Sequence, residues 1–139
     1  MATVLLIEDS ADNRNVTELI LADAGHTVIS AGDGRHGLDL AARAQPDLIL
    51  MDVALPRLDG WQATRRLKAQ SATQHIPIVA FTAHVTPDAL ARAETAGCVA
   101  VVTKPFEIAT ILQTIARVLA QSAPARRQRA VGTNWDEHG

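Results

Sequence analysis

The 139-residue sequence has no tyrosine, two tryptophans, two phenylalanines and a single cysteine, Cys98. A lone cysteine cannot form an intramolecular disulfide, and Cys98 is more typical of a small buried residue than of a reactive thiol. No apolar run approaches the roughly 20 residues that a membrane-spanning helix needs. The N-terminal segment has no basic region and reaches Glu8 too early for a signal peptide. These absences predict a cytoplasmic protein.

The sequence also lacks a large charge of either sign. The formal net charge is −2, and 47% of the residues are hydrophobic. This balance predicts one globular domain with no general attraction to nucleic acid or to an anionic membrane. Three arginines near the C-terminus, Arg126, Arg127 and Arg129, have no aromatic residues among them, so they form a poor nucleic-acid site.

Four short apolar runs predict buried strands. None of them alternates with polar residues, which is typical of strands covered on both faces in a parallel sheet. A fifth run, 27–31, is half polar and is predicted to lie at an edge of the sheet. The four buried runs are 4–7, 48–51, 78–81 and 99–102.

Helical patterns separate these runs. An apolar stripe ends at Gly25, Asp33 is placed to cap a second helix, and residues 60–70 carry apolar residues at helical spacing. Thr86 precedes a proline and an acid, which predicts a fourth helix that stops at Gly97. The last helix has its apolar stripe over 108–119. Five β-α units predict a doubly wound, flavodoxin-like α/β fold with strand order 2-1-3-4-5.

The helical pattern ends near Ala123. We expect one folded domain over residues 1–122 and a disordered tail over 123–139, because the tail is polar and has no apolar stripe. Trp135 in this tail is a candidate anchor for a partner or a second copy. The sequence predicts a monomer or a weak dimer.

Polar residues gather where the predicted strands end. Glu8 and Asp9 follow the first strand, Asp52 ends the third, and Thr82 ends the fourth. Lys104 follows the fifth. In the predicted strand order these ends are neighbours, and ligands of such sheets bind beyond the carboxyl ends of the strands. We therefore expect three carboxylates, a hydroxyl and an ammonium in one crevice.

Three crowded carboxylates need a cation. At an effective dielectric of about 20, each like-charge pair at 4 Å costs about 4 kcal/mol. Oxygen ligands in a site open to water suit Mg²⁺, and Lys104 neutralises a further charge. An ionised Asp52 is a nucleophile that needs no base, so the crevice is suited to accept a phosphoryl group as an aspartyl phosphate.

These motifs resemble the receiver domain of bacterial two-component response regulators. The matching pieces cover residues 3 to about 121, and the chain is similar to the small single-domain regulators of the family. The matching motifs are Glu8-Asp9, Asp52 in "DLILMD", Pro56 and Gly60 in "LPRLDG", Thr82 in "VAFTA", and Lys104-Pro105 in "TKP".

The resemblance implies specific roles at the metal site. Asp9, Asp52 and the backbone carbonyl of Ala54 would bind Mg²⁺ directly, and Glu8 would bind it through water. The phosphoryl donor would be a phosphohistidine on a sensor kinase or a phosphotransfer protein. The phosphorylated domain would then act through contacts with a downstream protein.

The resemblance also implies a switch, from which this chain departs. Lys104 would contact the phosphoryl oxygens and would precede a cis bond to Pro105, which costs only about 0.5–1 kcal/mol. Thr82 would move toward the phosphoryl group, followed by an aromatic residue or histidine three positions before the lysine. That position is Val101 here. The threonine half of the switch is present and the aromatic half is missing.

Two other functions compete with this one. A Mg²⁺-dependent phosphatase with an aspartyl nucleophile would have a second acid two residues after Asp52, where this chain has Ala54. A flavin-binding module would have a hydroxyl- and glycine-rich phosphate loop where Glu8 and Asp9 stand. A P-loop NTPase is excluded because the G-x-x-x-x-G-K-[ST] motif is absent. We therefore expect no enzyme activity beyond the chain's own phosphorylation and dephosphorylation.

Overall fold

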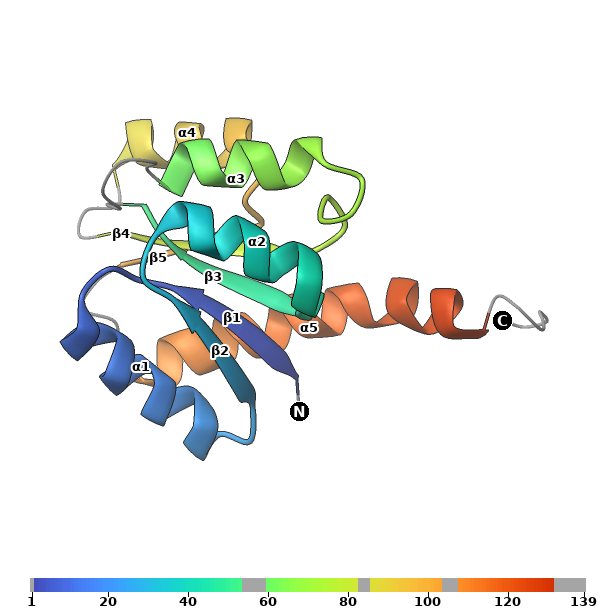
Figure 1. Cartoon of the computed structure of the whole chain (residues 1–139), viewed down its shortest axis with the longest axis horizontal. Helices are drawn as coiled ribbons and strands as arrows, with labels where there is room; N and C mark the ends of the chain where they lie inside the picture. Colours follow the sequence, from blue (N-terminus) through green and yellow to red (C-terminus); the bar gives the residue numbers. More distant parts are fainter. Residues whose placement is uncertain (1, 54–59, 83–85, 104–107, 132–139) are drawn as a thin grey trace.

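The computed structural model describes residues 2–53, 60–82, 86–103 and 108–131, and it gives only the backbone at 103, 108 and 122–131. Five strands alternate with five helices in these segments (Figure 1). The strands are β1 (Thr3–Ile7), β2 (Thr27–Ala31), β3 (Leu48–Asp52), β4 (Ile78–Thr82) and β5 (Ala100–Thr103). The helices are α1 (Ala11–Asp23), α2 (Gly34–Ala44), α3 (Gly60–Ala69), α4 (Pro87–Ala96) and α5 (Ile108–Val131).

The strands form one parallel sheet in the order β2-β1-β3-β4-β5, which confirms the predicted topology. The half-polar β2 lies at an edge, as its composition predicts. Every residue of β3 in the centre of the sheet is buried. A continuous apolar run is stable there because helices cover both faces of the strand.

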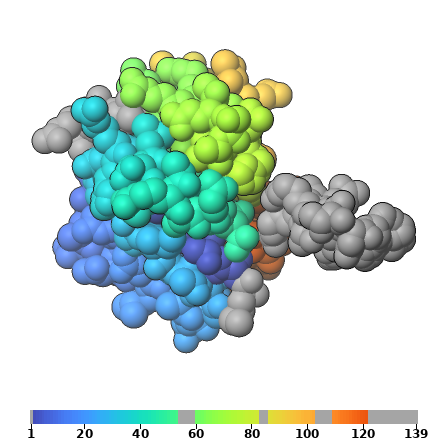
Figure 2. Space-filling view, turned by 45° about the vertical axis from the view of Figure 1, so that its right-hand side comes forward, coloured from blue at the N-terminus to red at the C-terminus, as the bar shows by residue number. Residues whose placement is uncertain are grey.

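Two apolar layers lie on opposite faces of the sheet. Leu5 and Ile7 of β1 point to the face covered by α2 and α3, whereas Val4 and Leu6 point to the face covered by α1 and α5 (Figure 1). This alternation follows from the two-residue period of a strand. A third cluster, built around Trp61, fills the space between α3 and α4. The space-filling view shows the surface of α2 between that of α1 and β2 on one side and that of α3 on the other (Figure 2).

The predicted helix signals are confirmed. The side chains of Asp33 and Thr86 cap α2 and α4 by accepting hydrogen bonds from His36 N and Ala89 N. Gly97 ends α4 in the left-handed region, at φ 106°, which glycine adopts without steric cost. These caps fix where α2 and α4 begin and where α4 ends, because each cap acts at a defined residue.

The last helix differs from the expectation. α5 continues to Val131, so residues 123–131, for which the sequence predicts disorder, are helical. Most of residues 125–131 are alanine, arginine or glutamine, which are good helix formers, whereas Pro124 is a poor one because it has no N–H to donate. This part of α5 extends past the sheet, away from the other helices (Figure 1). Trp135 lies outside the described residues. Within the described residues, no helix is both long enough and apolar enough to cross a membrane.

Candidate functional site

The register of the sheet brings the predicted acids together. Ile7 pairs with Met51 across β1 and β3, so the next residues, Glu8 and Asp52, reach the carboxyl edge at the same level. Asp9 follows Glu8 directly in the turn toward α1. The sequence placed these residues at strand ends, and the register makes them neighbours.

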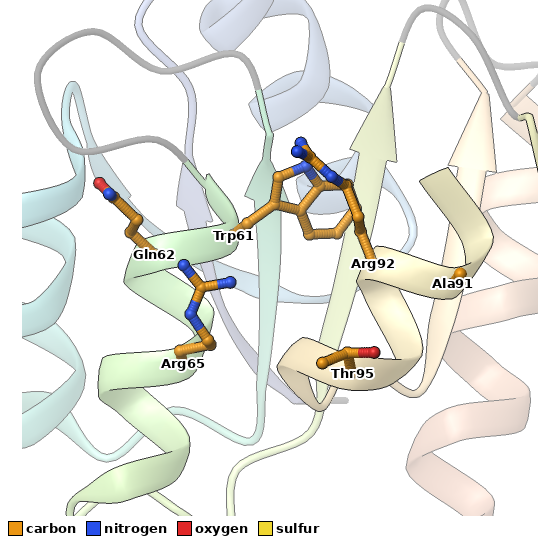
Figure 3. Close-up of a pocket in the computed structure, with 6 residues that line it drawn as sticks. All are labelled: Trp61, Gln62, Arg65, Ala91, Arg92 and Thr95. Carbon is orange, nitrogen blue, oxygen red and sulfur yellow. The ribbon is translucent and has the colours of Figure 1, made fainter. Parts of the chain in front are cut away.

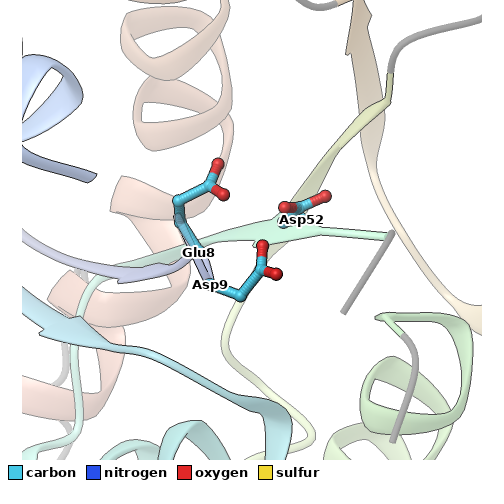
Figure 4. A group of neighbouring side chains, drawn as sticks. All are labelled: Glu8, Asp9 and Asp52. Carbon is cyan, nitrogen blue, oxygen red and sulfur yellow. The ribbon is translucent and has the colours of Figure 1, made fainter. Parts of the chain in front are cut away.

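The three carboxylates form a compact group, which we call the acidic cluster: Glu8, Asp9 and Asp52. One carboxylate oxygen from each residue lies within 4.8 Å of the others (Figure 4). Asp52 is 1% exposed and Glu8 is 2% exposed, whereas Asp9 is exposed at the rim. The cluster therefore opens to solvent on the side of Asp9.

The turn between β1 and α1 holds Glu8 in place. Glu8 Oε2 accepts a hydrogen bond of 3.1 Å from Ser10 N, and Glu8 N donates to Ala31 O at 3.0 Å. Arg14 Nη1 donates to the backbone carbonyl of Glu8 at 2.9 Å. Sequence reasoning missed Arg14, because a residue in the first turns of a helix gives no signal that its side chain folds back on the preceding strand.

The start of α3 abuts the backbone of Asp52. A Cβ atom on Gly60 would lie 2.4 Å from Val53 Cα and 2.5 Å from the carbonyl oxygen of Asp52, distances that side chains do not tolerate. Gly60 N also donates to Val53 O at 3.2 Å. A glycine at position 60 therefore lets α3 begin directly against the end of β3, next to the acidic cluster.

Thr82 ends β4 one register step beyond Asp52, because Asp52 pairs with Phe81 across β3 and β4. Its side chain is partly buried. Thr82 pairs in turn with Thr103 at the end of β5. Ala54, Lys104 and Pro105, including the predicted cis bond, lie outside the described residues.

Val101 stands where the resemblance implies an aromatic residue or histidine, and the structure shows what surrounds it. Val101 packs against the cluster formed by Trp61, Ala80, Ala93 and Ala96. The aromatic side chain of this cluster is therefore Trp61 of α3, and β5 contributes the smaller Val101. Trp61 is 8% exposed, as expected for a packing residue.

The single cysteine has the environment of a packing residue, as expected from the sequence. Cys98 is partly buried, and burial raises the pKa of its thiol to about 11, although a hydrogen bond to Thr64 acts in the opposite direction. Such a thiol holds its proton at neutral pH, which agrees with a packing role and not a reactive one.

The acidic cluster has the donor chemistry of a site for a hard divalent cation. It offers only carboxylate oxygens, two of its three residues are almost fully buried, and like charges held this close repel strongly. Mg²⁺ is bound in proteins by one or two carboxylates with several waters retained, and the exposed side at Asp9 leaves room for water. The residues present therefore fit such an ion.

Comparison with known proteins identifies the family. The model of the response regulator receiver domain matches residues 4–116. The polar-differentiation response regulator DivK of Brucella anthropi is 32% identical over 120 residues, which cover 86% of this chain and 98% of DivK. DivK of Brucella ovis has the same identity and coverage.

Solved structures give the same answer. Chemotaxis protein CheY4 of Vibrio cholerae is 34% identical, with a TM-score of 0.81 over 85% of this chain and 98% of CheY4. The receiver domain of a sensor histidine kinase of Pseudomonas aeruginosa, solved with a magnesium ion coordinated in its active-site cleft, is 34% identical, with a TM-score of 0.80 over 86% of this chain and 98% of that domain. The chain therefore belongs to the response regulator receiver domain family and is a phosphoacceptor receiver of two-component signalling.

Proposed function

We propose that Asp52 is the residue that accepts the phosphoryl group. The observation that carries this proposal is the position of Asp52, which is 1% exposed at the carboxyl end of the central strand and within 4.8 Å of two other carboxylates. A carboxylate held among like charges is a good nucleophile when a cation offsets the repulsion. Asp9 leaves the cluster open on one side, which is the side from which a phosphoryl group enters.

The transfer is an in-line displacement. An Asp52 carboxylate oxygen attacks the phosphorus of a phosphohistidine, a P–O bond forms, and the P–N bond breaks. The imidazole leaves with the bonding electron pair and takes up a proton. Phosphoryl transfer depends chiefly on positioning and on charge stabilisation. Gly60 and the β1–β3 register supply the positioning in this chain.

We propose that the acidic cluster binds Mg²⁺, with Asp9, Asp52 and the Ala54 carbonyl as direct ligands and Glu8 acting through water. The bound ion would offset the negative charge on the phosphoryl oxygens. Ser10 N and Arg14 fix the side chain and the carbonyl of Glu8, which keeps this ligand in place before the ion arrives. The magnesium-bound kinase receiver supports this assignment by similarity.

We propose that Lys104 and Thr82 bind the phosphoryl oxygens, with a cis Lys104–Pro105 bond directing the lysine inward. Thr82 lies at the required edge of the sheet, one register step from Asp52. Val101 fills the position of the family's aromatic switch residue and is too small to repeat its motion. We expect the response to centre on the segment between Thr82 and α4.

We propose a sensor histidine kinase or a phosphotransfer protein as donor, and a downstream protein as the reader of the phosphorylated state. Any turnover is the chain's own phosphorylation and dephosphorylation. Such donors receive their phosphoryl group from ATP, and we therefore propose that the protein works in the cytoplasm. We propose a monomer or a weak dimer as its oligomeric state. We assign the receiver domain to residues 1–122; residues 132–139 of the tail predicted over 123–139 lie outside the described residues.

Intact mass spectrometry tests the central assignment. After incubation with acetyl phosphate and Mg²⁺, we expect wild-type protein to gain the mass of one HPO₃ group, and Asp52→Asn to gain none. Asp39→Asn is the matched control, because Asp39 is an exposed aspartate on α2 whose ion pair with Arg43 is at the surface. The assignment is wrong if Asp52→Asn is modified as fully as Asp39→Asn.

A further inference from the structure

A groove with a volume of 410 Å³ lies between α3 and α4 (Figure 3). It shares no residue with the acidic cluster. We call it the α3–α4 groove, and it is lined by Trp61, Gln62, Arg65, Ala91, Arg92 and Thr95. Trp61 is buried and the other five residues are exposed. A small metabolite would have most of its surface enclosed by its site, so this open groove is better suited to a segment of polypeptide.

The floor of the groove is rigid and apolar. Trp61 packs in one buried cluster with Ala80 of β4 and with Ala93 and Ala96 of α4. Gly60 precedes it and packs against the backbone of Asp52 and Val53, which fixes the start of α3. A floor that is already ordered loses little conformational freedom when a ligand binds.

Both charged residues that line the groove are arginines, although the chain as a whole has a net charge of −2. The acids of α4, Asp88 and Glu94, are not among the lining residues. Arg65 enters the groove from α3 and Arg92 enters it from α4 (Figure 3). Two guanidinium groups beside an indole ring suit carboxylates flanked by apolar side chains, because guanidinium binds carboxylates through paired hydrogen bonds.

The intramolecular partner of Arg92 is weak. Arg92 Nε lies 3.7 Å from Asp88 Oδ2, and the two side chains are 62% and 83% exposed. A long, exposed ion pair contributes little, because solvent screens it. Arg92 is therefore available to a carboxylate that reaches the groove with better geometry.

We propose that the α3–α4 groove is a docking surface for an acidic segment of a partner protein. Carboxylates of that segment bind Arg65 and Arg92, and an apolar side chain between them packs on Trp61. The hydroxyl of Thr95 offers a hydrogen bond to the backbone of the segment. This surface goes beyond the proposed function, because it shares no residue with the acidic cluster.

Fluorescence anisotropy with a labelled synthetic peptide tests the proposal. The probe is Glu-Asp-Phe-Glu-Asp-Phe-Glu, and its neutral counterpart is Gln-Asn-Phe-Gln-Asn-Phe-Gln. We expect unphosphorylated wild-type protein to bind the acidic peptide at least about tenfold more tightly than the neutral one. The proposal is overturned if the acidic peptide does not bind, or if the two peptides bind equally.

A pair of double variants separates the groove from general charge attraction. Arg65→Glu with Arg92→Glu reverses both groove arginines, whereas Arg43→Glu with Arg66→Glu reverses two exposed arginines outside it. We expect at least about tenfold weaker peptide binding in the first variant and less than about twofold in the second. Equal losses in both would overturn the proposal, and so would tighter binding of a single-stranded DNA oligonucleotide than of the acidic peptide.

Discussion

The acidic cluster and the α3–α4 groove differ in both charge and construction. The acidic cluster is built from strand ends whose register fixes three carboxylates within 4.8 Å of one another. The α3–α4 groove is built from two helices that meet over Trp61, and its charged side chains are exposed. A site formed by strand ends is rigid and confined to one edge of the sheet, whereas one formed by two helices depends on how those helices pack.

Gly60 and Trp61 join the two regions. Gly60 lies against the carbonyl of Asp52, and the next residue forms the floor of the α3–α4 groove. The two regions are therefore mechanically adjacent although they share no side chain. The changes described next disturb the groove, the acidic cluster or their junction, and so measure how independent the two regions are.

The largest expected effect is in the groove. Trp61→Ala removes a nearly buried indole from between α3 and α4, and we expect the free energy of unfolding to fall by about 3–5 kcal/mol. Urea unfolding followed by circular dichroism measures this change. Arg66→Ala, an exposed change on the same helix, is the control, with an expected effect within about 0.5 kcal/mol. Similar losses in the two variants would show that Trp61 does not support the packing of α4.

The next effect is specific to the acidic cluster. Mg²⁺ at about 100 times its dissociation constant should raise the wild-type free energy of unfolding by about 2.7 kcal/mol. In Asp9→Asn we expect most of this gain to disappear, because the variant removes one of the three carboxylates. Urea unfolding with and without MgCl₂ measures it, and Asp39→Asn should respond as the wild type does. An equal gain in Asp9→Asn would exclude Asp9 as a ligand.

A smaller effect is expected at the junction of the two regions. Gly60→Ala places a Cβ atom 2.4 Å from Val53 Cα, and relieving this overlap should cost about 1–3 kcal/mol of unfolding free energy. Gly32→Ala is the matched control, since its added Cβ would lie 3.5 Å from Arg14 Nη1, an ordinary contact. Phosphorylation by acetyl phosphate should also slow in Gly60→Ala alone. If both alanine variants are equally stable, the close approach of α3 to β3 does not contribute to the free energy of unfolding.

The smallest effect concerns pH and the thiol beneath the groove. Burial raises the pKa of Cys98 from 9.0 to about 11, so the protonated thiol contributes stability that is complete below pH 9 and declines as pH rises toward 11. By about pH 10 the loss should be on the order of 1 kcal/mol relative to Cys98→Ala. Urea unfolding at pH 8 and pH 10 compares the two proteins. The pKa of Lys68 is lowered by burial and raised by the charge of Cys98, so the comparison reports the thiol together with its effect on Lys68.

Most of the fold follows from local patterns in the sequence. The apolar runs predict the strands, and the half-polar run at 27–31 predicts the edge strand, because burial on two faces requires a continuous apolar run. Asp33, Thr86 and Gly97 mark helix ends through caps that act within a few residues. The exception is α5, where residues without an apolar stripe continue the helix to Val131.

The candidate site is only partly readable from the sequence. Glu8, Asp9 and Asp52 were predicted to meet because they follow strands that the predicted order makes neighbours. Arg14 was not predicted, because its contact with the Glu8 carbonyl depends on the direction in which α1 leaves the sheet.

The α3–α4 groove was not predicted either. Its residues come from two helices separated by a strand, and neither helix carries a motif that points to the other.

The order of residues along the chain determined the five strands, their helices and the three acids that follow strand ends, because these signals act over a few neighbouring positions. Tertiary structure alone decided that the acids lie within 4.8 Å of one another, that α3 begins against Asp52, and that Arg65 and Arg92 border one groove. These contacts join segments far apart in sequence. Their geometry is set by sheet register and helix packing, which no local pattern encodes.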